Sequence, residues 1–350
     1  MATFFDFVSP RRVFAAIADY IAFLPPSPTY EIVSNDAKLL KMSFKDVAMW
    51  QYGEREKNLL DVSFTKTSSG NDIVCLFVSS AANAKYTILF SHGNAVDLGQ
   101  TASFFVRLAN RLNCNVFSYD YSGYGASKGK PSEKNLYSDL DAAWDALRTK
   151  YHVQEESVIL YGRSLGTVPT IDLATRLHKI PGVILQSPLA SALRMLLPSM
   201  SSTWSIDSFP SVDKAPRITA PVLVIHGTKD EVINFSHGQM VYDRCKNKLA
   251  PLWVQGAGHN DMEAFQEFWE RLEEFVDSDL GDEDKGMLQD RAFIPGIRVY
   301  KWHVPCIHEE LCGCHVRSQS VVQRGLQVQH GILFSLQFSE DPVQESLVSA

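Results

Sequence analysis

Short apolar runs alternate with amphipathic helical stretches from about Leu59 to Asp279, and this alternation is the strongest constraint on the fold. The runs that fit strands are residues 73–78, 87–91, 116–119, 157–161, 182–185, 222–225 and 252–254. The stretches with helical spacing are residues 100–112, 133–149, 165–178, 236–246 and 261–276. Strands separated by helices favour a parallel sheet with crossover connections. The pattern therefore predicts an α/β fold with one mostly parallel central sheet flanked by helices.

The chain divides into three parts: residues 31–280 carry the alternating pattern, residues 1–30 precede it and residues 281–350 follow it. In residues 1–30, the helical spacing places six apolar side chains on one face: Val13, Phe14, Ile17, Tyr20, Ile21 and Leu24. This amphipathic segment either docks on the central domain or lies in a membrane interface beside Arg11 and Arg12. We expect the last part to be a separate tail and a candidate for disorder.

Residues 188–216 interrupt the alternation in the second half of the predicted sheet, with Met, Ser and Pro residues scattered around Trp204. An insertion at this place forms either a short cap over the functional face of the sheet or a plain surface loop. The fold that we predict includes it as a short cap insertion.

Charge and composition exclude several classes of protein. The chain has 33 Lys and Arg, a net charge of −7 and no concentrated basic face, so we exclude nucleic acid as a partner. Cys75, Cys114 and Cys245 lie in apolar or helical contexts without paired spacing, which is typical of reduced thiols in the cytosol. No window reaches the roughly 18–20 apolar residues of a membrane span, and the start lacks a signal-peptide pattern, so we expect neither spanning nor secretion.

The motif Gly162-Arg163-Ser164-Leu165-Gly166 follows one of the apolar runs directly and precedes a helical stretch. A strand, a sharp turn and a helix around G-x-S-x-G are typical of the nucleophile elbow of the α/β-hydrolase fold. The turn strains the backbone at the serine, and the small glycines leave room for strand and helix to approach. The motif predicts Ser164 as a nucleophile near a helix N-terminus, whose N–H groups favour developing negative charge.

A serine hydroxyl needs a base within hydrogen-bond reach and a third group that orients the base. In this fold the acid and then the histidine follow the serine along the chain. Asp230 comes just after the predicted strand 222–225, and His259 lies in the loop Gly256–Asp261 before the last helix. We therefore predict a catalytic triad of Ser164, Asp230 and His259.

Other residues compete for these roles. Glu231 and Asp261 are alternative carboxylates, but Asp261 has the position of a helix cap. We interpret His226 and His237 as structural residues and His92 as a residue that braces its loop.

Attack on a carbonyl builds an oxyanion, which needs preorganised donors. The backbone N–H of Leu165, the residue after the nucleophile, is the first expected donor. The second is expected from the loop Ser91–Ala95, with Asn94 as the favoured residue.

Long motifs extend this pattern through Phe23–Pro26, Phe90–Gln100, Phe117–Ser127, Ser164–Thr170, His226–Thr228, Phe235–Gly238 and Gly256–Asp261. In these motifs the sequence resembles the alpha/beta hydrolase domain-containing type 17 protein depalmitoylases, from about Ala22 to about Leu280, some three quarters of the chain. The resemblance implies the same triad, and hydrolysis of the thioester between palmitate and a protein cysteine without a cofactor. It also implies S-acylated membrane-associated proteins as substrates and a peripheral position on the cytosolic face of plasma or endosomal membranes.

The sequence departs from the family at both ends. Family members look to carry an acylated cysteine cluster near the N-terminus, whereas residues 1–74 here contain no cysteine. Peripheral membrane contact would then rest on residues 1–24, and without an anchor we expect a cytoplasmic protein. The tail collects Cys306, Cys312 and Cys314 among three histidines, but this spacing matches no usual zinc pattern, so we predict no metal site.

The residues alone leave two other functions open. The same triad hydrolyses oxygen esters, so a carboxylesterase or lipase acting on lysolipids or monoacylglycerols is one alternative. A non-catalytic scaffold built on the hydrolase fold is the other.

Overall fold

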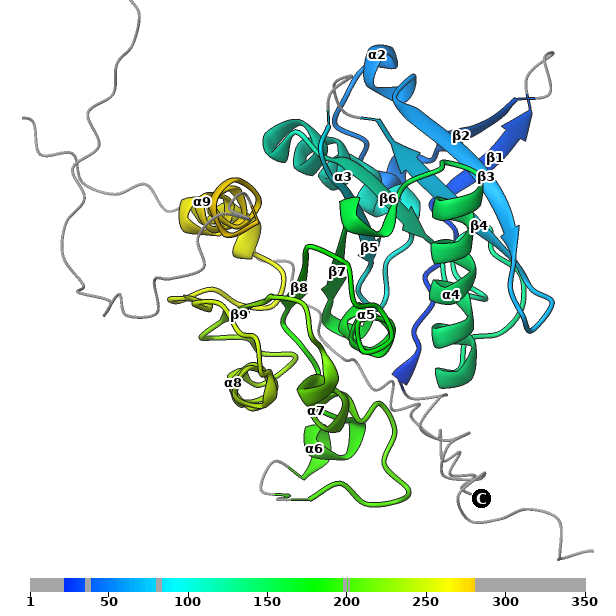
Figure 1. Ribbon diagram of the computed structural model, residues 1–350. Coiled ribbons are helices and arrows are strands. Elements are labelled where there is room, and N and C mark those ends of the chain that lie inside the picture. The colour runs from blue at the N-terminus through cyan, green and yellow to red at the C-terminus, as the bar shows by residue number, and fades with distance from the viewer. Residues whose placement is uncertain (1–21, 35–38, 80–83, 198–199, 201, 281–350) are drawn as a thin grey trace, which may run out of the picture. The chain divides into compact units, whose positions relative to one another are not determined.

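The computed structural model describes residues 22–34, 39–79, 84–197, 200 and 202–280. Within them, a central sheet of eight strands forms the body of the domain, as can be followed in Figure 1. Their order is β10-β9-β8-β7-β5-β6-β4-β3. The strands are β3 (Leu60–Lys66), β4 (Asp72–Val78), β5 (Thr87–Ser91), β6 (Asn115–Tyr119), β7 (Val158–Arg163), β8 (Gly182–Gln186), β9 (Val222–Gly227) and β10 (Leu252–Val254). Neighbours from β10 to β6 are parallel, and β4 is antiparallel to both β6 and β3. The mostly parallel sheet agrees with the prediction.

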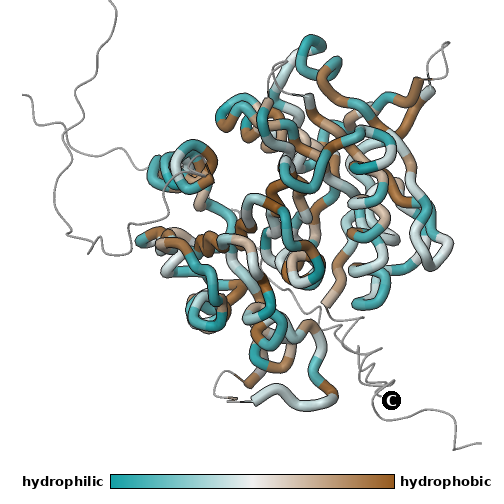
Figure 2. The backbone as a smooth tube through the Cα atoms, viewed as in Figure 1, coloured by the Kyte–Doolittle hydropathy of each residue, from teal (hydrophilic) through white to brown (hydrophobic). Residues whose placement is uncertain are grey.

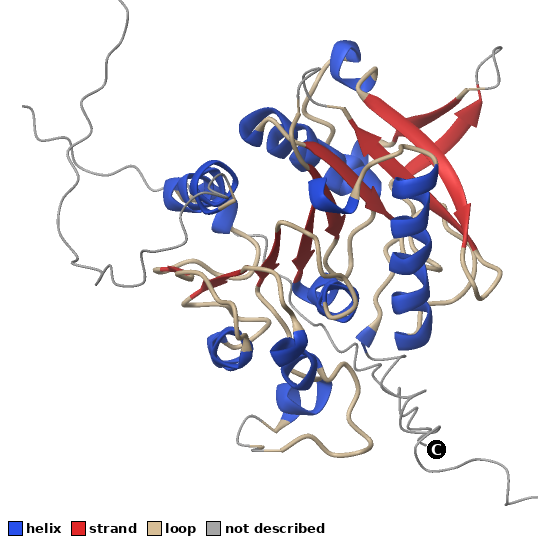
Figure 3. Cartoon of the chain, viewed as in Figure 1, coloured by secondary structure: helices blue, strands red, loops and turns tan. Residues whose placement is uncertain are grey.

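Helices cover both faces of this sheet, as Figure 3 shows. One face carries α3 (Leu98–Leu112) and α9 (Gln266–Glu274), and the other carries α4 (Glu133–Thr149), α5 (Thr167–Ala174) and α8 (Phe235–Arg244). The helices α3 and α4 begin at side-chain caps: Asp97 accepts a hydrogen bond from the N–H of Gln100, and Ser132 accepts one from Asn135. Such caps satisfy backbone donors that have no partner within the helix.

The core is split into two layers by the sheet itself. Ile88 and Phe90 of β5 belong to the cluster with α3 and α9, whereas Leu89 between them belongs to the cluster with α4 and α5. Successive side chains of a strand point to opposite faces, so a strand buried on both faces needs a continuous apolar run. Figure 2 shows apolar residues concentrated in the strands and polar ones on the outer helices.

Several elements differ from the predicted ones. Three strands were not predicted: β1 (Tyr30–Ser34) and β2 (Leu40–Phe44), which form a separate antiparallel hairpin, and the edge strand β3. Each has exposed positions and lacks the continuous apolar run on which the prediction relied. The predicted helix 165–178 ends at Ala174, and the predicted helix 261–276 is three pieces, η5 (Met262–Ala264), α9 and a π-helical turn η6 (Phe275–Asp279). Further short elements are η1 (Asp46–Ala48), α2 (Glu54–Lys57), η2 (Glu155–Ser157) and η3 (Ser164–Gly166).

The insertion after β8 contains short helices, α6 (Ala192–Leu196), α7 (Ser211–Lys214) and η4 (Ala215–Arg217). Residues 1–21 and 281–350, with most of the predicted amphipathic helix and the whole tail, lie outside the described residues. The described part of the first segment packs on the domain, where Phe23 is buried in edge-to-face contact with Phe209. Within the described residues, no helix has the length and apolar character needed to cross a bilayer.

The buried carboxyl group of Asp139 holds the loop after β6 in place through two hydrogen bonds. Asp139 of α4 accepts hydrogen bonds from the backbone N–H and the hydroxyl of Ser122, both at 2.7 Å. Burial raises the pKa of Asp139 from 3.8 to about 6, although the two hydrogen bonds from Ser122 oppose the rise. The folded state therefore keeps the proton over a pH range in which the unfolded chain releases it.

Because the folded-state pKa is raised, Asp139 makes the free energy of unfolding fall as pH rises from about 4 to about 6. A pKa change of this size corresponds to about 3 kcal/mol. Asp139→Asn keeps an oxygen for Ser122 but does not ionise, so its stability is expected to fall less over this range. Urea unfolding of both proteins at either end of the range measures the difference, and equal pH dependence would contradict the assignment.

Candidate active site

Ser164 lies at a sharp turn between β7 and α5, and its backbone has the left-handed φ of 53°. The glycines of the motif allow the close packing around it. A Cβ on Gly166 would lie 2.0 Å from the carbonyl oxygen of Ser91, and one on Gly162 would lie 2.6 Å from the carbonyl oxygen of Gly166. Both distances are impossible for a real Cβ, so the turn requires glycine at both positions.

The structure brings the three predicted triad residues together. Ser164 Oγ lies 3.0 Å from His259 Nε2, and His259 Nδ1 lies 2.7 Å from Asp230 Oδ2. Exposure is only 6% for Ser164, 6% for His259 and 9% for Asp230. A carboxylate, an imidazole and a hydroxyl linked in this order are the arrangement that activates a serine as a nucleophile.

Asp230 is surrounded by hydrogen-bond donors. Besides His259, its Oδ2 lies 2.8 Å from Ser187 Oγ and 3.2 Å from His226 Nε2. Its Oδ1 accepts from the backbone N–H groups of Val232 and Ile233. Burial alone would raise the pKa of Asp230, but the hydrogen bonds from His226, His259 and Ile233 hold it well below its usual value. The carboxylate is therefore ionised at neutral pH.

The competing residues occupy supporting positions. Glu231 Oε2 accepts from the backbone N–H of His259, and Asp261 Oδ1 accepts from that of Gly258. Asp261 has the predicted N-cap position, that of η5, but its side chain makes no cap hydrogen bond there and instead braces the loop that carries His259. His237 Nδ1 accepts from the N–H of Ala190.

His226 does more than the structural role predicted for it, because it contacts Asp230 directly. Its Nε2 also lies 2.9 Å from the carbonyl oxygen of Ile233, and its Nδ1 has no partner among the described residues. Two acceptors at Nε2 place the proton on that nitrogen. His226 lies in β9 and Asp230 in the loop after it, so the helical rule for residues four apart does not apply, and no local pattern in the sequence indicates this contact.

The loop after β5 faces the elbow. His92 braces it as predicted, with Nδ1 2.8 Å from the carbonyl oxygen of Gly93 and Nε2 3.3 Å from Asp120. The side chain of Asn94 is engaged elsewhere. Its Oδ1 accepts from Leu24 N–H, Tyr124 Oη and Ala95 N–H, and its Nδ2 donates to the carbonyl of Ala22.

The backbone N–H of Asn94 is therefore the group that is left as a candidate for the predicted oxyanion donor. No hydrogen bond within the described part of the chain uses that group. The backbone N–H of Leu165, the other predicted donor, lies in η3 directly after the nucleophile.

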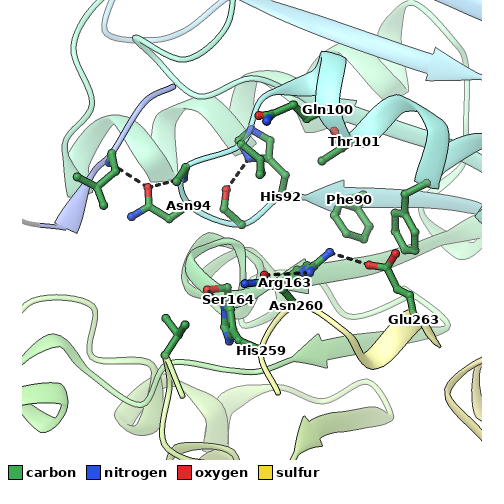
Figure 4. A pocket seen from close by; sticks show the side chains of 16 residues that line it. Phe90, His92, Asn94, Gln100, Thr101, Arg163, Ser164, His259, Asn260 and Glu263 are labelled. Atoms are coloured by element: carbon green, nitrogen blue, oxygen red, sulfur yellow. Dashed lines mark hydrogen bonds and ion pairs between the residues drawn. The ribbon is translucent and has the colours of Figure 1, made fainter. Parts of the chain in front are cut away.

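A pocket of about 370 Å³ opens above Ser164 and His259 (Figure 4). One part of its wall is apolar, with Leu24, Phe90, Val96, Phe104 and Val232. The polar part includes an ion pair in which Arg163 Nη1 lies 2.8 Å from Glu263 Oε1. The pocket offers an apolar surface beside an activated serine.

A second pocket of about 300 Å³ lies on the other side of Val232 and includes Asp230 and Glu231. Here the insertion contributes Arg194 and Met195, whereas none of its described residues lines the pocket of Ser164. The described part of the insertion thus borders the acid of the triad rather than the nucleophile. Among the described residues, no group of three or more His, Cys, Asp or Glu side chains is placed to hold a metal ion.

Gly166→Ala is expected to lower the free energy of unfolding by about 1–3 kcal/mol, because the new methyl overlaps the backbone of Ser91 and forces the elbow apart. Urea unfolding measures the loss. Gly53→Ala is the control, since its Cβ would approach nothing closer than 3.6 Å and its φ of −87° suits any residue. Equal stability of the two variants would refute the packing argument.

Asn94→Ala tests which group of Asn94 acts on an oxyanion. If the backbone N–H is the donor, the rate at which a fluorophosphonate labels Ser164 should fall by less than about tenfold, whereas losing a side-chain donor costs about 100- to 1000-fold. Asn135→Ala, which removes a distant hydrogen bond to the carbonyl of Lys130, is the control. A loss of 100-fold or more with unchanged stability would assign the donor to the side chain.

Known proteins resemble this chain at three levels. A family model described as Hydrolase_4, serine aminopeptidase, S33, matches residues 82–206. An esterase from Pyrococcus furiosus has a similar structure, with a TM-score of 0.53 and 20% identity, covering 65% of this chain and 95% of that one. That likeness shows the fold alone, which is the predicted α/β-hydrolase fold.

Two close relatives show which family this chain belongs to. Alpha/beta hydrolase domain-containing protein 17B of Xenopus tropicalis is 54% identical over 265 residues, which cover 75% of this chain and 92% of the relative. Alpha/beta hydrolase domain-containing protein 17C of Mus musculus is 49% identical over 290 residues, covering 75% of this chain and 90% of the relative. This chain is an α/β serine hydrolase that belongs to the alpha/beta hydrolase domain-containing protein 17 family.

Proposed function

We propose that this protein hydrolyses the thioester of S-palmitoylated proteins and so releases the protein thiol and the fatty acid. The observation that carries the proposal is the chain of hydrogen bonds from Asp230 through His259 to Ser164, beside a pocket with an apolar wall. The thioester itself comes from the resemblance of the sequence motifs to protein depalmitoylases. We assign the roles of nucleophile, base and orienting acid to these three residues.

In the first half of the reaction, Ser164 Oγ attacks the thioester carbonyl while His259 Nε2 takes its proton. The ionised Asp230 holds the other ring nitrogen and stabilises the imidazolium. The backbone N–H groups of Leu165 and Asn94 stabilise the oxyanion. The carbon–sulfur bond then breaks, and the thiolate takes the proton from His259, leaving an acyl group on Ser164.

In the second half, His259 removes a proton from a water molecule that attacks the acyl group on Ser164. The same two N–H groups hold the second oxyanion. When the bond to Ser164 Oγ breaks, that oxygen takes the proton back from His259, and the fatty acid is released. The cycle uses only this chain's side chains and water, so the proposal involves no cofactor.

The pocket supports an acyl substrate. Phe90 and Phe104, whose ring centroids lie 5.7 Å apart, form one wall, and Leu24 and Val232, which are 58% and 48% exposed, lie at its edge. Burying each methylene of an acyl chain against such a surface contributes about 0.8 kcal/mol. Because palmitoylated proteins reside on membranes, we further propose that the enzyme acts as a peripheral protein at the cytosolic membrane surface.

An apolar pocket serves a lipid ester as well as a protein thioester, so hydrolysis of lysolipids or monoacylglycerols is the second candidate. Both reactions pass through the same acyl-enzyme, and only the leaving group differs. Direct comparison of a palmitoylated peptide with a palmitoylglycerol separates them.

Wild-type protein is expected to react with a fluorophosphonate and to release thiol from a palmitoylated cysteine peptide. Ser164→Ala should lose both activities by at least about 1000-fold, because no other group of the site replaces the nucleophile. Labelling is followed by mass spectrometry and thiol release by a thiol-reactive dye. Ser118→Ala serves as a control, since its hydroxyl bonds to the carbonyl of Phe90 and lies outside the triad.

The outcomes separate the candidate functions. Labelling with faster cleavage of palmitoylglycerol than of the peptide would favour the lipid esterase. A folded wild-type protein that neither labels nor cleaves would favour a non-catalytic scaffold and sink the proposal.

A further inference from the structure

Ser187 directly follows β8, at the carboxyl end of the strand next to the one that leads to Asp230. The residue is fully buried, and its backbone N–H donates to the carbonyl of Ile225 at 2.8 Å. Its hydroxyl donates to Asp230 Oδ2 at 2.8 Å. Ser187 thus connects the end of β8 to the acid of the triad.

The backbone of Ser187 is in an unfavourable conformation. Its φ of 47° lies in the left-handed region, which glycine adopts freely and a serine does not. A glycine here would relieve the backbone but would lack the hydroxyl. A non-glycine residue at such a buried position is a reason to look for a function of its side chain.

The hydroxyl of Ser187 has a specific place among the donors to Asp230. It acts on Oδ2, the same oxygen that accepts from His259 Nδ1, whereas the backbone N–H groups of Val232 and Ile233 act on Oδ1. His226 Nε2 also approaches Oδ2, at 3.2 Å, but it lies closer to the carbonyl oxygen of Ile233, at 2.9 Å. Besides His259, Ser187 and His226 therefore both act on Oδ2, and the Ser187 hydroxyl makes the shorter contact, with no second acceptor among the described residues.

We infer that Ser187 is a positioning residue of the active site: its hydroxyl, held by a left-handed backbone, fixes the Asp230 oxygen that orients His259. The inference rests on the proposed function only in taking Ser164, His259 and Asp230 as a working triad. Ser187 itself does not touch the reacting atoms. It acts on the reaction through the orientation of the carboxylate and of the imidazole behind Ser164.

The test compares Ser187→Ala and Ser187→Gly in the full chain. Both variants remove the hydroxyl, but only glycine relieves the left-handed backbone, so Ser187→Gly should be the more stable of the two. Because both lose a hydrogen bond to a charged group, both should label with fluorophosphonate about tenfold more slowly than wild type. Ser138→Ala, which breaks a hydrogen bond with Ser68 away from the site, should label at the wild-type rate.

The pH dependence of labelling provides a readout that a purely structural serine would not change. A carboxylate that has lost a donor attracts the proton on His259 more strongly. The acid limb of the labelling rate plotted against pH should therefore move to higher pH in both variants. Other titratable or charged groups around this cluster are His226, His237 and Arg194, Glu231 beside the backbone of His259, and the Arg163–Glu263 pair in the pocket. All of them are present in every variant.

Three results would overturn the inference. One is a wild-type labelling rate in Ser187→Gly, which would mean that only the backbone conformation matters. Another is slower labelling in both variants while the acid limb of the pH profile stays at its wild-type position, which would make Ser187 a purely structural residue. The third is a wild-type protein that does not label at all, because the triad that Ser187 is inferred to position would then not be a working one. Failure of the thioesterase proposal is seen separately, as labelling of Ser164 without release of thiol from the peptide.

Discussion

The close approach of backbone at the nucleophile elbow is the constraint on which the rest of the site depends. Gly166 packs against the carbonyl groups of Ser91 and His92, at distances that leave no space for a Cβ. Strands β5 and β7 are parallel neighbours with Ser91 opposite Gly162, so the loop after β5 must lie beside the turn at Ser164. The two predicted oxyanion donors, at Leu165 and Asn94, come from these two neighbouring segments.

A second constraint is the buried charge of Asp230. An ionised carboxylate removed from water is costly unless hydrogen bonds replace its hydration. Here the donors come from the end of β8, from β9, from the loop after β9 and from the His259 loop. The sheet order places β8 beside β9, which brings these groups to one carboxylate. The position of the acid is therefore a property of the sheet as well as of its own loop.

The chain before the hydrolase domain is also joined to the active site. Asp97 accepts hydrogen bonds from the backbone N–H and the hydroxyl of Thr29, and Asp120 accepts one from the hydroxyl of Tyr30. The side chain of Asn94 accepts a hydrogen bond from the backbone N–H of Leu24 and donates one to the carbonyl of Ala22. Leu24 consequently lines the pocket of Ser164, so a residue that the sequence pattern assigned to a separate segment forms part of the pocket wall.

The sequence by itself determined the class of sheet, because buried parallel strands need continuous apolar runs. It also determined the elbow, because the sharp turn at Ser164 needs glycine at positions 162 and 166. Local patterns also placed Asp230 and His259 after strands, where parallel strands present their loops on one edge. The exposed hairpin of β1 and β2 carries no such pattern, and prediction missed it.

Only the tertiary structure decided the contacts of side chains far apart in the chain. Nothing near Asn94 in the sequence indicates that its amide binds the backbone of Ala22, and nothing near Ser187 indicates Asp230, 43 residues away. Such hydrogen bonds depend on which strands are neighbours and on where each loop returns to the sheet. The physical reason is that packing of the whole domain sets these distances, whereas local sequence sets only the element in which each residue lies.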